Sequence, residues 1–249
     1  MSSARQLLQL LQLNGGTFPT GGFSQSWGLE TYVAEGKVKD TETFRVFLES
    51  YLTSSIGKCE GPIICKAYEL TGQLQADQDA PAAGRGEAFS QDRGGAASQL
   101  RELEKLSTAV KVTKESREAG QRMGKAFARI VEPMVAEEDF LLLREVFGSV
   151  SISYPVIYGC VCRMLGIDLD EALTAYIFST ANTLTQSALK LIPLGNVEAQ
   201  KVLFDMDGEM EQVARLCRSV ALDEITNFCP GIDIASLKHE ELPVRLYMS

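Results

Sequence analysis

The sequence predicts an all-α protein, a single-domain bundle of roughly eight to ten helices over residues 1–249. Two observations favour this fold class. Apolar residues recur at three- and four-residue spacings through most of the chain, as they do on one face of a helix. The alternation of apolar and polar residues that is typical of strands is not found. An apolar content of 45% is enough to build the core of such a bundle.

The first predicted helix carries Leu7, Leu8 and Leu11 on one side and leads into a glycine-rich stretch, residues 15–30. Four of its glycines form two pairs around Pro19. Glycine permits positive φ or a close approach of the backbone, and proline keeps the preceding residue out of the helical region. The stretch therefore predicts a shaped turn, which either cradles a ligand or clamps two helices together.

Asp40 or Thr41 is predicted to cap the next helix, because short polar side chains accept hydrogen bonds from the first turn. The glycines of residues 57–61 are predicted to break this helix, and Pro62 suits the first turn of another. Residues 76–97 are rich in Ala, Gly, Asp, Gln and Arg and contain few apolar anchors. We expect them to form a flexible surface insertion within the one domain.

A long helical segment is predicted from Gln99 to about Val131, with an interruption at residues 110–113, where β-branched side chains crowd. Asp168 or Asp170 is predicted to cap a buried central helix. The remaining helices are expected at residues 137–147, 154–165, 169–191 and about 197–217, the last with a weak point at Gly208.

The charge of the chain excludes several classes of partner. A net charge of −9 and a pI near 4.8 disfavour nucleic acids and anionic membrane surfaces, both of which require a basic face. No apolar run is long enough to span a membrane. The N-terminus lacks the apolar core of a signal peptide, which predicts a cytoplasmic protein whose six cysteines are reduced core thiols.

Catalytic and metal-binding patterns are weak. The glycine-rich stretch follows a helix, whereas a phosphate-binding loop follows a strand. Cys160 and Cys162 project from different sides of their helix, and His239 is the single histidine of the chain. A metal shared at a dimer axis stays open as an alternative. The pattern as a whole favours a binding or assembly role over catalysis.

Several segments, taken in series, resemble the UreF family of urease accessory proteins. The resemblance covers nearly the whole chain outside residues 72–98. The segments that carry it are Leu8–Leu10, Pro19–Ser24, Gly28–Glu30, Glu115–Arg117 with Gly124, Tyr154–Pro155 with Gly159, Leu191–Gly195 with Gln200, and His239–Glu240 with Arg245, Leu246 and Ser249. Four residues depart from the family pattern: Lys190 and Asn196 stand where the family often has Arg and Gln, and Tyr247 and Met248 stand where Phe and Arg are common. Lys190 keeps the charge but not the planar fork of Arg.

The resemblance implies a non-catalytic, all-α homodimer without a cofactor of its own. Such a protein binds UreD (also called UreH) and recruits the GTPase UreG, so that nickel is inserted into the urease apoprotein. The C-terminal tail, residues 233–249, is then the segment that docks a partner. The residues implied in partner binding are Gly21, Gly22, Phe23, Ser24, Glu30, Lys190, Pro193, Gly195, His239, Glu240 and Arg245.

Two alternatives belong to other classes of function. One is a helical small-molecule enzyme with residues 21–24 as its active-site loop, and the other is a nickel-binding metallochaperone. His239 is a candidate for a partner contact or a nickel path, although an ordinary exposed tail histidine is the simpler interpretation because a nickel ligand needs companions. We expect the glycine-rich turn to form a surface that UreD or UreG recognises.

Overall fold

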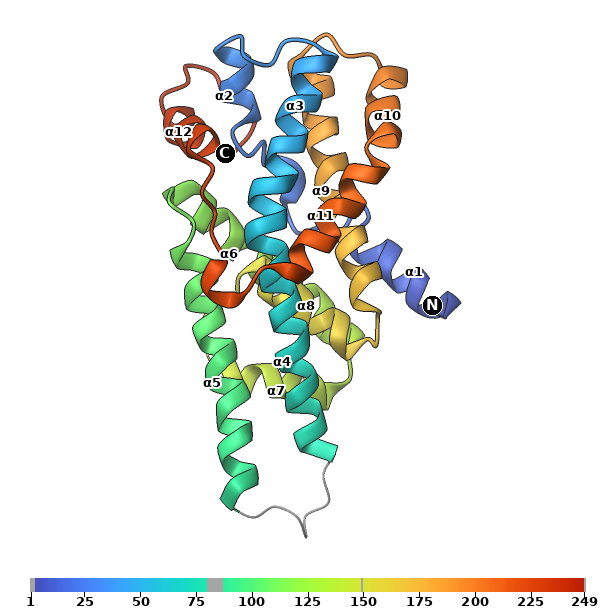
Figure 1. Ribbon diagram of the computed structural model, residues 1–249, viewed down its shortest axis with the longest axis vertical. Helices are drawn as coiled ribbons and strands as arrows, with labels where there is room; N and C mark the ends of the chain where they lie inside the picture. The colour runs from blue at the N-terminus through green and yellow to red at the C-terminus, as the bar shows by residue number, and fades with distance from the viewer. Residues whose placement is uncertain (1–2, 80–86, 149, 249) are drawn as a thin grey trace.

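The computed structural model describes residues 3–79, 87–148 and 150–248. The side chains of residues 77–94 are outside this description. Helices follow one another through the described residues, which contain no strand (Figure 1). The prediction of an all-α fold is therefore confirmed.

Six α-helices form the described part of the N-terminal half. They are α1 (Ala4–Leu13), α2 (Leu29–Ala34), α3 (Thr41–Tyr51), α4 (Gly61–Asp79), α5 (Glu87–Ala109) and α6 (Lys114–Val131). The C-terminal half continues with α7 (Glu137–Phe147), α8 (Tyr154–Met164), α9 (Leu169–Leu191), α10 (Asn196–Asp205), α11 (Asp207–Ser219) and α12 (Pro230–His239). Short 3₁₀ turns lie at Gly22–Ser24, Glu132–Met134 and Leu222–Glu224.

Helix ends with a capping signal lie where the sequence predicts them. The carboxylate of Asp40 accepts a hydrogen bond from the backbone N–H of Thr43 at the start of α3. Asp168 caps α9 in the same way. The predicted interruption at residues 110–113 separates α5 from α6, and Thr113 caps the latter. The side-chain oxygen is what satisfies the free N–H groups of a first turn, so these boundaries follow from local chemistry.

The predicted break at residues 57–61 is wrong. A π-helical stretch, Leu52–Glu60, joins α3 to α4 without a turn. The glycines allow α11 to pack closely: a Cβ on Gly57 would lie 2.8 Å from Leu216 Cδ2, and one on Gly61 would lie 2.0 Å from Cys217 Sγ. They therefore serve helix packing and not chain reversal.

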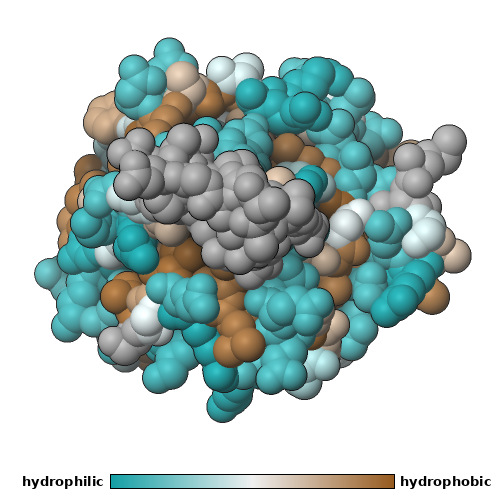
Figure 2. All heavy atoms as spheres, turned by 90° about the horizontal axis from the view of Figure 1, so that it is seen from below, coloured by the Kyte–Doolittle hydropathy of each residue, from teal (hydrophilic) through white to brown (hydrophobic). Residues whose placement is uncertain are grey.

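The predicted insertion at residues 76–97 overlaps two helices. Helix α4 continues to Asp79 and α5 begins at Glu87, whereas residues 80–86 lie outside the described residues. Figure 2 views the molecule from this end and shows separate areas of hydrophobic residues, in brown, among hydrophilic residues, in teal. The flexibility expected of the segment stays a prediction.

Helices α8 and α9 lie in the core, as expected for the apolar segments that encode them. Every residue from Pro155 to Cys162 is buried. Two glycines permit a close approach of neighbouring backbone: a Cβ on Gly124 would lie 2.0 Å from the carbonyl oxygen of Ile152, just before α8, and one on Gly159 would lie 2.6 Å from that of Ile64 in α4. Such contacts leave no room for a side chain.

Five of the six cysteines are core residues, as the sequence predicts, whereas Cys229 is only half-buried. Those that are buried are Cys59, Cys65, Cys160, Cys162 and Cys217. Burial raises the pKa of the Cys160 and Cys162 thiols to about 12, which keeps both neutral and unreactive at physiological pH.

The apolar side predicted for the first helix is wrong, because the fold buries the other side of that helix. Leu10 and Leu13 are buried, whereas Leu7, Leu8 and Leu11 are at least half exposed. In the described part of the chain, none of the helices is both long and apolar enough to cross a membrane.

Candidate functional site

The C-terminal helix and the glycine-rich loop pack together, although they lie at opposite ends of the sequence. Helix α12 lies beside α2 (Figure 1). The hydroxyl of Thr31 donates a hydrogen bond to the carbonyl oxygen of Ala235 at 2.9 Å. Gly28 has a φ of 85° and would bring a Cβ to 3.3 Å from Ala235. Glycine is therefore required here both by the backbone conformation and by the neighbouring helix.

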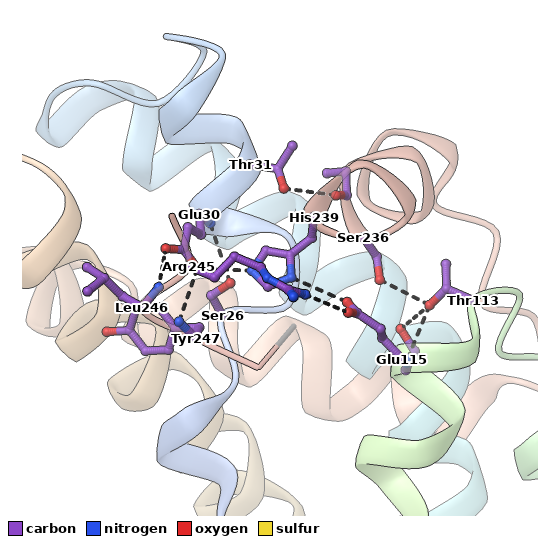
Figure 3. A network of polar contacts seen from close by, with 12 residues as sticks. Ser26, Glu30, Thr31, Thr113, Glu115, Ser236, His239, Arg245, Leu246 and Tyr247 are labelled. Atoms are coloured by element: carbon purple, nitrogen blue, oxygen red, sulfur yellow. Dashed lines mark hydrogen bonds and ion pairs between the residues drawn. The ribbon is translucent and has the colours of Figure 1, made fainter. Parts of the chain in front are cut away.

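Glu30 holds the tail that follows α12. Its carboxylate is buried and accepts hydrogen bonds from the backbone N–H groups of Leu246, at 2.7 Å, and Tyr247, at 3.2 Å. The same carboxylate lies 3.0 Å from Nε2 of His239. Figure 3 shows these groups converging on Glu30 from α12 and the tail. One side chain thus fixes three positions of the C-terminal segment.

His239 is fully buried, so the expectation of an exposed tail histidine is wrong. Helix α12 turns the imidazole inward, where Nδ1 lies 3.4 Å from a carboxylate oxygen of Glu115 at the start of α6. The other oxygen of Glu115 lies 3.8 Å from the guanidinium of Arg245. Burial raises the pKa of Glu115, and His239 and Arg245 oppose that shift only in part. We call Glu30, Glu115, His239 and Arg245 the tail cluster.

Residues 21–24 contact the end of the tail. Gly21 has a φ of 84°, and its carbonyl oxygen accepts a hydrogen bond from the Ser24 hydroxyl at 2.7 Å. The carbonyl oxygen of Ser24 accepts a hydrogen bond from the backbone N–H of Met248 at 2.8 Å. The glycine-rich loop and the C-terminal tail therefore form one continuous surface.

Apolar side chains project into solvent from this surface. In the tail, alternate residues Val244, Leu246 and Met248 are more than half exposed, whereas Tyr247 between them is buried. Phe23, on the adjoining loop, is 66% exposed. We call Phe23, Val244, Leu246 and Met248 the loop–tail patch. Exposed apolar groups held together in this way are typical of an interaction surface.

The other residues predicted for the site lie around this patch or beyond it. Lys190, near the end of α9, places its ammonium 5.8 Å from the centre of the Tyr247 ring. Glu240 is exposed just after α12. Pro193 and Gly195 are exposed in the turn between α9 and α10, and none of the polar contacts described for them reaches the tail. The structure thus joins the loop, Glu30, Lys190, His239 and Arg245, but not the α9–α10 turn.

A second polar centre lies beneath the glycine-rich loop. Its ammonium–carboxylate pair is Lys111 and Glu60, whose Nζ and Oε1 atoms are 2.7 Å apart. The hydroxyl of Tyr176 donates to the other oxygen of Glu60, also at 2.7 Å. These groups and Gly22 line the same cavity. Across the described ranges, no group of three or more His, Cys, Asp or Glu side chains is arranged to hold a metal ion.

Fold and site together define an all-α protein whose glycine-rich N-terminal loop and C-terminal tail are locked together by buried charges. The UreF family model matches residues 38–207, which is more than half of the chain. The chain therefore belongs to the UreF family, as its sequence motifs indicate.

Curated relatives extend the similarity to both ends of the chain. A urease accessory protein UreF of Bacillus sp. (strain TB-90) is 29% identical over 250 residues, which cover 98% of this chain and 99% of that protein. The protein of the same name from Paenarthrobacter aurescens (strain TC1) is 27% identical and covers 99% of this chain and all of its own length. The one from Sporosarcina pasteurii is 28% identical over 89% of this chain. Loop, tail and tail cluster thus belong to a segment that full-length relatives share.

Proposed function

We propose that the chain is a non-catalytic scaffold of urease maturation in the cytoplasm. It acts as a homodimer, binds UreD (UreH) and recruits the GTPase UreG for the insertion of nickel into the urease apoprotein. Membership of the UreF family and the name of its relatives, urease accessory protein, support this role. The observation that carries it is the loop–tail patch, which consists of exposed apolar side chains on a firmly held backbone.

We assign the patch to the contact with UreD. Its apolar side chains can serve as anchors, while Lys190 and Arg245 provide charge at the edge, as in the polar rim of an interface. Glu30 and Ser24 fix the tail backbone before any partner arrives. A surface ordered in advance loses less conformational entropy on binding.

The rival hypotheses receive less support from the same contacts. The hydroxyl of Ser24 donates a hydrogen bond to a backbone carbonyl oxygen. This bond stabilises the turn, whereas a catalytic serine would donate to a general base. Both nitrogens of His239 face carboxylates inside the fold. We therefore favour the scaffold over an enzyme or a metallochaperone.

The substitution Gly22→Val tests this function. A Cβ on Gly22 would lie 3.1 Å from the terminal methyl group of Met123, a flexible side chain that can move aside. We expect a soluble protein with wild-type helical circular dichroism that recovers at least about tenfold less UreD, since one branched side chain spoils a close-packed contact. Urease in cells should stay inactive with this variant.

Gly16→Val is the matched control, because a Cβ on Gly16 meets no atom within 4 Å. It should activate urease as the wild type does. Normal urease activation by Gly22→Val would contradict the assignment of the loop to a partner.

A further inference from the structure

Two hydrogen-bond acceptors face each other in the tail cluster. The Oε2 atom of Glu115 and the Nδ1 atom of His239 are 3.4 Å apart and buried, and neither has a hydrogen-bond partner among the described residues. An ionised carboxylate can only accept, and an imidazole that donates from Nε2 to Glu30 can only accept at Nδ1. The contact is therefore favourable only when a proton lies between the two atoms.

The same proton balances the charge of the cluster. Glu30 and Glu115 contribute two carboxylates, and Arg245 contributes one guanidinium. With one proton shared by His239 and Glu115 the cluster is neutral, whereas without it a buried negative charge is left unpaired. An unpaired buried charge strongly opposes the folded arrangement.

The other charged and titratable groups near the cluster do not supply that balance. Lys190 is exposed beside the Tyr247 ring, and none of the ion pairs among the described residues joins it to Glu30 or Glu115. Glu240 is exposed and raises the pKa of Glu115 further. Lys238, on the outer side of α12, pairs with Glu35. The hydroxyl of Tyr247 is buried in the tail and has no hydrogen-bond partner in the described part of the chain.

We propose that the tail cluster is a proton-dependent latch, in which one proton shared by His239 and Glu115 keeps the C-terminal tail docked and its loss releases the tail. The proposal deepens the proposed function by naming a regulation of the loop–tail patch, and it rests on that function only for its effect on UreD. Release of the tail would take Val244, Leu246 and Met248 away from Phe23.

The direction of the pH dependence follows from Glu115. Burial raises the pKa of this carboxyl in the docked state, so the docked state binds a proton more tightly than the open state. Docking is therefore strongest at low pH and weakens as the pH rises through the range in which the shared proton is lost.

Hydrogen–deuterium exchange of the full chain tests the latch. The backbone N–H groups of Leu246, Tyr247 and Met248 donate to Glu30 or Ser24, so they exchange slowly while the tail is docked. After correction for intrinsic exchange, their protection should fall by up to about tenfold per pH unit at the high-pH end, the limit for loss of one proton. A peptide from the buried helix α9 in the same samples should keep constant protection.

The variant Glu115→Gln makes the test specific. Its amide group can donate to Nδ1 of His239 at any pH, so it imitates the bound proton. We expect a docked tail whose protection does not change from about pH 5.5 to about pH 8.5, the range over which the wild-type profile is recorded. Glu118→Gln, which removes an exposed carboxylate of the same helix, should keep the wild-type profile.

Constant wild-type protection across this range would overturn the latch. A Glu115→Gln variant that follows the wild-type profile, or whose tail is unprotected at every pH, would overturn it as well. The experiment uses the isolated chain, so it separates the two proposals. If the protection of the tail depends on pH but the protein does not bind UreD, the proposed function is wrong and the latch is still supported.

Discussion

Glu30→Gln is expected to release the C-terminal tail from the body of the protein. The carboxylate accepts from two tail N–H groups and from His239, whereas an amide of the same shape has one accepting oxygen. The NH₂ group would face donors, and hydrogen bonds to a charged group are worth about 1.5–3 kcal/mol each. Trypsin should therefore cleave after Arg245 about ten to one hundred times faster than in the wild type.

Glu35→Gln is the control for this prediction. Glu35 is the residue that follows α2, and its salt bridges to Lys238 and Lys37 are exposed, so its loss should change the rate of cleavage little. Equal rates for Glu30→Gln and the wild type would show that this carboxylate does not hold the tail.

Lys111→Met is expected to destabilise the whole fold more than any surface change. Lys111 and Glu60 keep only 10% and 14% of their side-chain surface exposed. Burial is the largest single influence and lowers the pKa of Lys111, but the charge and hydrogen bond of Glu60, together with Cys59 and Glu104, raise the pKa overall. The ion pair therefore stabilises the folded state fully at any pH below the ordinary lysine pKa. This contribution is lost only as the pH rises through the raised pKa of Lys111. Removal of one partner of a buried pair costs about 3–5 kcal/mol at neutral pH.

Urea unfolding followed by circular dichroism measures this cost. The double variant Lys111→Met, Glu60→Gln should recover most of the lost stability, because the amide oxygen can still accept from Tyr176 while no charge is left unpaired. If the free energy of unfolding of the single Lys111→Met variant lies within about 1 kcal/mol of the wild-type value, the Lys111–Glu60 pair does not act as a buried ion pair.

Local chemistry explains which parts of the fold are predictable from the sequence. Asp40 and Asp168 cap helices through neighbours two or three residues away, so their signal is present in a short window of sequence. The π-helical stretch that ends at Glu60 depends on the distant packing of α11 against two glycines. Helix α12 escapes prediction because it buries the polar Ser236 and His239 and exposes the apolar Ile234 and Leu237, so its sequence lacks the usual apolar period of a helix.

The same contrast between local signals and long-range contacts applies to the candidate site. The motifs single out residues 21–24, Glu30, His239 and Arg245 without showing what they contact. Glu115 belongs to one of the same motifs, but its contact with His239 joins positions that are far apart in the sequence. Spacing along the chain carries no signal for such a pair. The burial of His239 therefore becomes evident only from the structure.

Recovery of UreD by tagged Leu246→Asp protein tests the central claim most directly. Leu246 projects from the loop–tail patch and is 66% exposed, while its backbone N–H still donates to Glu30 in the variant. A carboxylate at an apolar contact should reduce recovery of co-expressed UreD at least about tenfold. Val46→Asp, an equivalent change at an exposed position of α3, should recover UreD as the wild type does. Undiminished recovery by Leu246→Asp with a docked tail would contradict the account.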